Sequence, residues 1–100
     1  EINAHAGANY AHLKYICPNI SYIGIEGNIN YSNVDIKEAH IKYMNYLDFN
    51  YSDYNEYFDY IIFNDTSDYS DNQKNEFLNL ARTSLKKNGT LLWCDKNTLN

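Results

Sequence analysis

The chain has 100 residues, of which 44% are hydrophobic and 21% charged, and its formal net charge is -5. This length allows one small hydrophobic core, and the composition is that of a folded chain rather than a disordered one. The charge argues against nucleic acid or an anionic membrane as the partner, because both bind basic patches and Lys86-Lys87 is the only adjacent basic pair. No apolar run approaches transmembrane length.

The two cysteines, Cys17 and Cys94, have no metal-ligand spacing and give no sign of a disulfide framework. We expect both to be free, buried thiols in a cytoplasmic protein, since the cytosol keeps thiols reduced. The acidic pair Asp65 and Asp68 has no partner at metal-ligand spacing, and we predict no metal.

The first half of the chain alternates between strand and helix patterns. Tyr10, Leu13 and Ile16 recur at helical spacing, and Pro18 ends that helix. The predicted elements are the end of a strand at residues 1–3, a helix at 8–16, a strand at 21–26, a short helix at 33–40 and a strand at 41–46. Because the first strand is already ending at residue 3, we expect the chain to be a piece of a longer protein.

The second half begins with a polar and aromatic loop, residues 48–56, followed by a strand at 58–64. The continuous apolar centre of that strand predicts burial on both of its faces. Ser70 followed by Gln73 predicts a capping box, with a helix running to about Lys86, whose positive charge suits a helix end. Asn88-Gly89 predicts the helix stop, and residues 90–94 form the last predicted strand.

Strands that alternate with helices predict crossover connections and a parallel sheet. We therefore expect one α/β domain over residues 1–100, with a doubly wound, mostly parallel sheet in the order 3-2-1-4-5 and helices on both faces. The predicted core consists of Ile23, Ile25, Ile61, Phe63, Leu78, Ala81, Leu85 and Leu92.

Ligands of open parallel sheets bind at the carboxyl ends of the strands, where Glu26 is the most informative residue. An acidic residue that ends the second strand can accept hydrogen bonds from both hydroxyls of a ribose, and Glu26 follows the Gly7 loop by about 20 residues, as in dinucleotide-binding sequences. The alternative is a solvated carboxylate at a strand end.

The loop Asn3–Gly7 precedes a helix, and its small residues would let a ligand approach the free backbone N–H groups. A pyrophosphate site would require two further glycines, so the loop does not predict one. His5 could act as a general base, although packing or capping is the more common role for such a histidine.

Five segments in order resemble the motifs of class I S-adenosylmethionine-dependent methyltransferases. Glu1–Gly7 resembles their glycine motif, with Asn3 and His5 in place of two glycines, and Tyr22–Glu26 resembles their second strand with its ribose-binding acid. The other three segments are Met44–Phe49, in which Asn45 replaces the acid that contacts adenine, Phe58–Asn64, and Leu85–Leu92.

The resemblance implies a truncated Rossmann-like methyltransferase fold, with S-adenosyl-L-methionine as the cofactor and methyl transfer to an unidentified acceptor. It assigns no catalytic residue, because Asn64-Asp65-Thr66-Ser67 differs from the family's Asn-Pro-Pro-aromatic motif. The implied cofactor-binding residues are Asn3, Ala4, His5, Ala6, Gly7, Glu26, Gly27, Asn45, Tyr46 and Asn64.

Two alternatives remain open. The first is a non-catalytic module of the same fold that serves packing or partner binding, with a cofactor pocket that has decayed; the altered glycine loop favours it. The second is another small doubly wound domain, such as a receiver-like one, which would require a carboxylate cluster where the sequence has Asn3-Ala4-His5. Other domains of a longer parent chain are the expected partners.

Overall fold

The computed structural model describes residues 1–95, and its contacts divide the chain into two compact units, Glu1–Tyr46 and Leu47–Asn100. The prediction of one domain over the whole chain is not tested by this division and stays a prediction.

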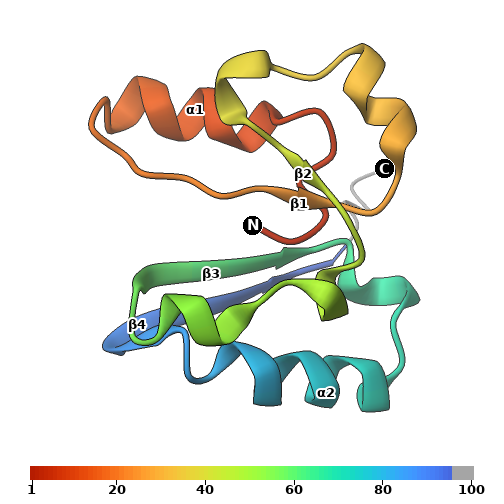
Figure 1. The fold of residues 1–100 in the computed structure, drawn as a ribbon, viewed down its shortest axis with the longest axis vertical. Helices are drawn as coiled ribbons and strands as arrows, with labels where there is room; N and C mark the ends of the chain where they lie inside the picture. The colour runs from red at the N-terminus through yellow and green to blue at the C-terminus, as the bar shows by residue number, and fades with distance from the viewer. Residues whose placement is uncertain (96–100) are drawn as a thin grey trace. The chain divides into compact units, whose positions relative to one another are not determined.

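Unit 1 contains a helix, α1 (Ala8–Ile16), and two short strands, β1 (Ile25–Glu26) and β2 (Lys42–Tyr43) (Figure 1). The strands are parallel, with Ile25 opposite Lys42, and Ile2 forms a further parallel bridge to Ile25. Three chain segments therefore lie side by side in the order Ile2, β1, β2, and their carboxyl ends share one edge.

The connection from β1 to β2 contains two 3₁₀ helices, Ile29–Asn33 and Lys37–Ala39, where we predicted one helix at 33–40. Asparagine side chains explain the first of them. Asn28 accepts a hydrogen bond from the Asn30 backbone N–H at 3.0 Å, and the Asn33 side-chain amide donates to the Asn30 carbonyl at 3.2 Å. Such local bonds compete with an α-helix and favour turns.

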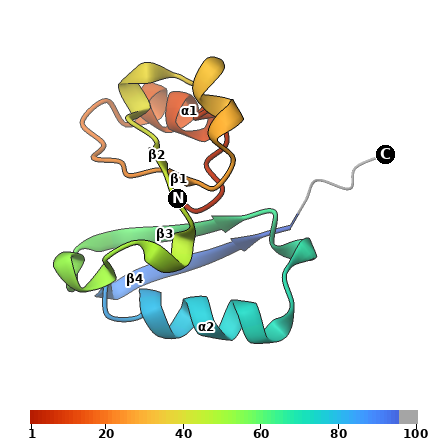
Figure 2. The same cartoon turned by 45° about the vertical axis from the view of Figure 1, so that its right-hand side comes forward.

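Unit 2 contains two strands, β3 (Phe58–Asn64) and β4 (Leu85–Cys94), joined by helix α2 (Asp71–Ala81), and two 3₁₀ helices, Tyr51–Tyr54 and Thr66–Asp68. The strands are parallel, and α2 lies along one face of them (Figure 2). The predicted capping box is confirmed, since Ser70 and Gln73 each accept a hydrogen bond from the other's backbone N–H.

The core of unit 2 is aromatic and lies between α2 and the strands. Phe63 and Phe77 are both fully buried, with ring centroids 4.6 Å apart and perpendicular planes. The ring of Trp93, which is 41% exposed, lies at the edge of this core, with its centroid 5.5 Å from that of Phe63 and 5.9 Å from that of Phe77. Aromatic pairs at these distances add to the stabilisation that burial alone provides.

The predicted five-stranded, doubly wound sheet with helices on both faces is wrong. The described residues form two separate two-stranded parallel sheets and two α-helices. β1 and β2 have only two residues each, and the asparagine turns occupy the connection between them. The predicted truncated methyltransferase fold depended on this sheet and is therefore also wrong.

Three smaller predictions in unit 2 are also wrong. Helix α2 ends at Ala81, and residues 85–87 belong to β4 rather than to the helix. β3 is not buried on both faces, because Tyr60 is 64% exposed while Phe63, on the α2 side, is fully buried. Leu92 was predicted in the core and is 41% exposed.

Neither α1, with nine residues, nor α2, with eleven, approaches the length of a membrane-spanning segment, and no other helix among residues 1–95 does so. Both cysteines are free, as predicted, but they are not buried: Cys17 is exposed and Cys94 is partly exposed.

Candidate ligand site at the strand ends of unit 1

Glu26 ends β1 at the shared carboxyl edge of unit 1, and it is only 5% exposed. Its carboxylate accepts two backbone hydrogen bonds of 2.8 Å, from the His5 N–H at Oε1 and from the Asn28 N–H at Oε2. The alternative of a solvated carboxylate is therefore wrong. Glu26 joins the loop that follows the first chain segment to the loop that follows β1.

The loop Asn3–Gly7 has left-handed backbone conformations at alternate residues, with φ of 60° at Asn3, 53° at His5 and 91° at Gly7. These are the three positions that the resemblance aligned with glycines. Glycine adopts positive φ freely, and asparagine and histidine are among the other residues that adopt it most often. The loop thus keeps a glycine-like backbone path although two of its three glycine positions carry side chains.

Two contacts fix this loop against the rest of unit 1. The Ala4 N–H donates to the Ile25 carbonyl at 3.0 Å, and the Ala6 carbonyl accepts from the Ile36 N–H at 2.8 Å. The φ of 91° at Gly7 favours glycine, and a Cβ atom there would also lie only 3.3 Å from the Cβ of Ala39, which is a tight contact.

The His5 imidazole stacks on the ring of Tyr31, with centroids 5.1 Å apart and planes 18° apart. Tyr31 belongs to the 3₁₀ helix that follows Glu26. Sequence reasoning missed Tyr31, since a partly exposed tyrosine among eleven carries no distinguishing signal. The stack favours a packing role for His5 over a role as a general base.

A second polar cluster lies beside Glu26, whose Cα partner across the ladder is Tyr43. The Tyr43 hydroxyl donates to Asp35, and Lys37 Nζ lies 2.6 Å from the other Asp35 oxygen. Burial, the bond to Asp35 and the negative charges of Asp35 and Glu26 raise the pKa of Tyr43 to about 12. The bonds from Lys37 and Tyr43 lower the pKa of Asp35.

Most of the predicted cofactor-binding residues lie on this edge. Asn3, Ala4, His5, Ala6 and Gly7 form the loop, and Glu26 contacts it. Gly27 follows Glu26 and is exposed, and Asn45 and Tyr46 follow β2. Asn64 ends β3 in unit 2 and is partly exposed.

The carboxylate of Glu26 retains acceptor capacity, because an ionised carboxylate has about four lone-pair sites and two are used here. Two ribose hydroxyls could thus be accepted once they reach the oxygens. Within residues 1–95, no three His, Cys, Asp or Glu side chains form a cluster that could hold a metal ion.

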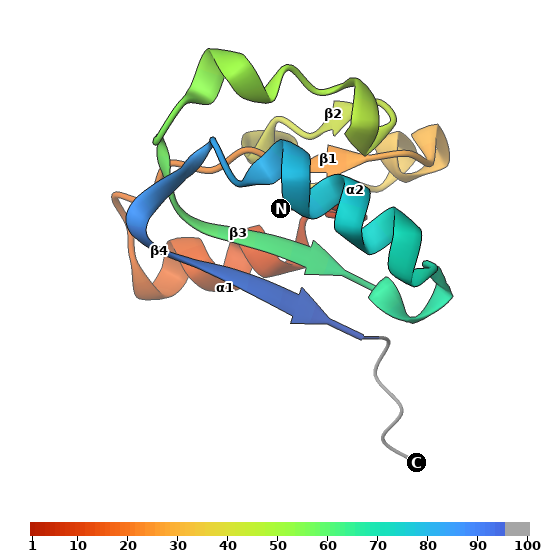
Figure 3. The same cartoon turned by 90° about the horizontal axis from the view of Figure 1, so that it is seen from below.

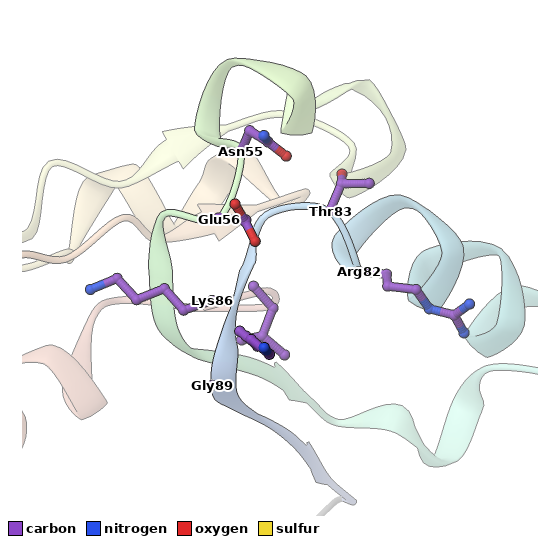
Figure 4. Close-up of a pocket in the computed structure, with 8 residues that line it drawn as sticks. Asn55, Glu56, Arg82, Thr83, Lys86 and Gly89 are labelled. Carbon is purple, nitrogen blue, oxygen red and sulfur yellow. The ribbon is translucent and has the colours of Figure 1, made fainter.

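A pocket of about 470 Å³ lies in unit 2, near the starts of β3 and β4 (Figure 4). It is lined by Asn55, Glu56, Arg82, Thr83, Leu85, Lys86, Lys87 and Gly89. None of the predicted site residues lines it. Its position at the amino ends of the strands is opposite to the end at which parallel sheets usually bind ligands.

No family model, curated protein or solved structure matches this chain.

Proposed function

We propose that unit 1 binds S-adenosyl-L-methionine and that the protein transfers its methyl group to an acceptor. One observation carries this proposal: the three loop positions aligned with glycines all have positive φ, and the loop lies against the buried carboxylate of Glu26. An adenosyl ligand requires a close backbone approach and an acid for the ribose, and this edge combines both.

In this proposal, Glu26 accepts the ribose hydroxyls, Asn45 contacts the adenine edge and the Asn3–Gly7 backbone faces the methionine part of the ligand. The bound cofactor supplies an activated methyl group, so the residues of the chain need only bind and orient it. A reducing cytoplasm is the proposed location, which agrees with two free cysteines.

One observation favours the non-catalytic alternative. Glu26 is nearly buried and both of its oxygens already accept backbone N–H groups, so the carboxylate has a structural role without any ligand. Ribose binding then requires the loop to open at some cost in free energy. In the alternative, that opening never occurs and Glu26 serves only to hold the two loops together.

Isothermal titration of the chain with S-adenosylmethionine and S-adenosylhomocysteine separates the two functions. We expect binding of both ligands, and a loss of about tenfold in affinity for Asn45→Ala, which removes one hydrogen bond from an exposed residue. Asn30→Ala, another exposed asparagine of unit 1 outside the predicted site, is the matched control. If neither ligand binds at millimolar concentration, the non-catalytic function replaces the proposed one.

A further inference from the structure

The ladder between β3 and β4 contains a wide irregularity. Phe58 pairs with Leu85 and Tyr60 pairs with Thr90, so four residues of β4, 86–89, oppose the single residue Asp59 of β3. Extra residues in one strand are left out of regular pairing and bend the chain locally. Figure 3 shows the resulting bend at the start of β4.

This bulge contains Asn88-Gly89, the only Asn-Gly sequence in a chain with sixteen asparagines. Asn88 is exposed to solvent. Gly89 lies in a crowded place, because a Cβ atom there would lie 2.7 Å from Leu85 Cδ1 and 3.0 Å from the Asp59 carbonyl oxygen, so a side chain would force Leu85 to move. The fold thus keeps the residue without a side chain directly after an exposed asparagine, outside regular strand pairing.

We propose that Asn88 is a site of spontaneous deamidation. The Gly89 backbone nitrogen loses its proton and attacks the side-chain carbonyl carbon of Asn88, Cγ. A bond forms between this nitrogen and Cγ. The bond from that carbon to the side-chain nitrogen breaks, and ammonia leaves with the proton. Water then opens the cyclic imide at either carbonyl, which gives aspartate or isoaspartate. A glycine in the second position favours the ring because no Cβ obstructs the approach or restricts the backbone.

The pocket beside the bulge has a mostly basic lining. Arg82, Lys86 and Lys87 line the pocket beside Gly89 together with one carboxylate, Glu56 (Figure 4). Lys86 also lies 3.1 Å from Asp59. The product adds a carboxylate directly after Lys87, in a chain that is already acidic.

Incubation of the whole chain at mildly alkaline pH, followed by peptide mass spectrometry, tests the proposal. We expect the peptide containing Asn88 to gain about 1 Da and to yield isoaspartate, while Asn72 and Asn79, both exposed on α2 and followed by residues with side chains, stay unchanged. The rate at Asn88 in the denaturant-unfolded chain serves as the reference, because the fold does not restrict the backbone there.

The native rate at Asn88 should lie within about tenfold of the unfolded rate if the bulge permits ring closure. A native rate suppressed by much more than that, or one no faster than the rate at Asn79, would overturn the proposal. The wild-type chain alone decides this outcome, so no variant that fails to fold can obscure it.

Discussion

Replacing Glu26 with alanine should destabilise unit 1, and the loss can be worked out from its two hydrogen bonds. Each bond joins a backbone N–H to a charged acceptor at 2.8 Å, and the acceptor is 5% exposed. Hydrogen bonds of this kind contribute about 1.5 kcal/mol each at the lower end of their range, which gives about 3 kcal/mol for the pair. The Glu26→Gln variant retains one good acceptor, so its loss of stability should be about half of that estimated for Glu26→Ala.

The measurement must report on unit 1, whereas the single tryptophan, Trp93, lies in unit 2. Native-state hydrogen exchange at the backbone amides of His5 and Asn28 is therefore the suitable assay, with urea unfolding followed by circular dichroism beside it. Glu38→Ala is the matched control, since Glu38 is exposed in the same unit. If Glu26→Ala costs less than about 1 kcal/mol and leaves both amides as protected as the control does, the carboxylate does not hold the loops together.

Phe63→Ala should cost about 3–5 kcal/mol in urea unfolding, because the ring is fully buried, whereas Tyr60→Ala on the exposed side of the same strand should cost far less; equal losses would show that the two faces are misassigned. Ser70→Ala should cost about 1 kcal/mol in the same assay through loss of the helix cap, and no loss would contradict the capping box. The pKa of Tyr43, about 12, lies above its ordinary value of 10.0, so its contribution to stability is complete below pH 10 and is lost as pH rises towards 12. An NMR pH titration of the Tyr43 ring should show a lower pKa in the Asp35→Asn variant than in the wild type. An unchanged pKa would contradict the contact between Tyr43 and Asp35.

Local signals in the sequence predicted the elements that local physics determines. Helix α1 has the bounds that apolar spacing gave it, and β3 has the bounds of its apolar run. The Ser70 cap set the start of α2 correctly. In each case the residues that determine the element lie within a short stretch of sequence, so the prediction did not depend on a distant partner.

The end of α2 depends on a partner that no periodicity reveals. Ser84 is fully buried and its hydroxyl donates to the Tyr51 carbonyl at 2.6 Å, 33 residues earlier in the chain. Its own carbonyl accepts from the Tyr57 and Phe58 backbone N–H groups. These bonds hold the chain at residue 84 in the turn that starts β4, and they override the helical spacing that runs through Leu85.

The candidate site was predictable in part for a similar reason. The rule that ligands bind at strand ends identified Glu26 and the loop before α1, and the structure places them in contact. The rule could not reveal that Glu26 accepts backbone N–H groups, because backbone donors are present at every residue except proline and leave no mark in the sequence. The stack of His5 on Tyr31 could not be predicted, because no sequence pattern connects the two residues.

The loop Asn3–Gly7 also bears on how glycine motifs are defined. A spaced-glycine pattern records only which side chains are missing. The way a ligand can approach the loop depends instead on the backbone dihedral angles. Here asparagine and histidine occupy two of three such positions with φ of 60° and 53°, a conformation that costs an ordinary residue roughly 1–2 kcal/mol. A motif written in terms of handedness, with glycine, asparagine and histidine treated as one class at alternate positions, would include loops of this shape that a glycine count rejects.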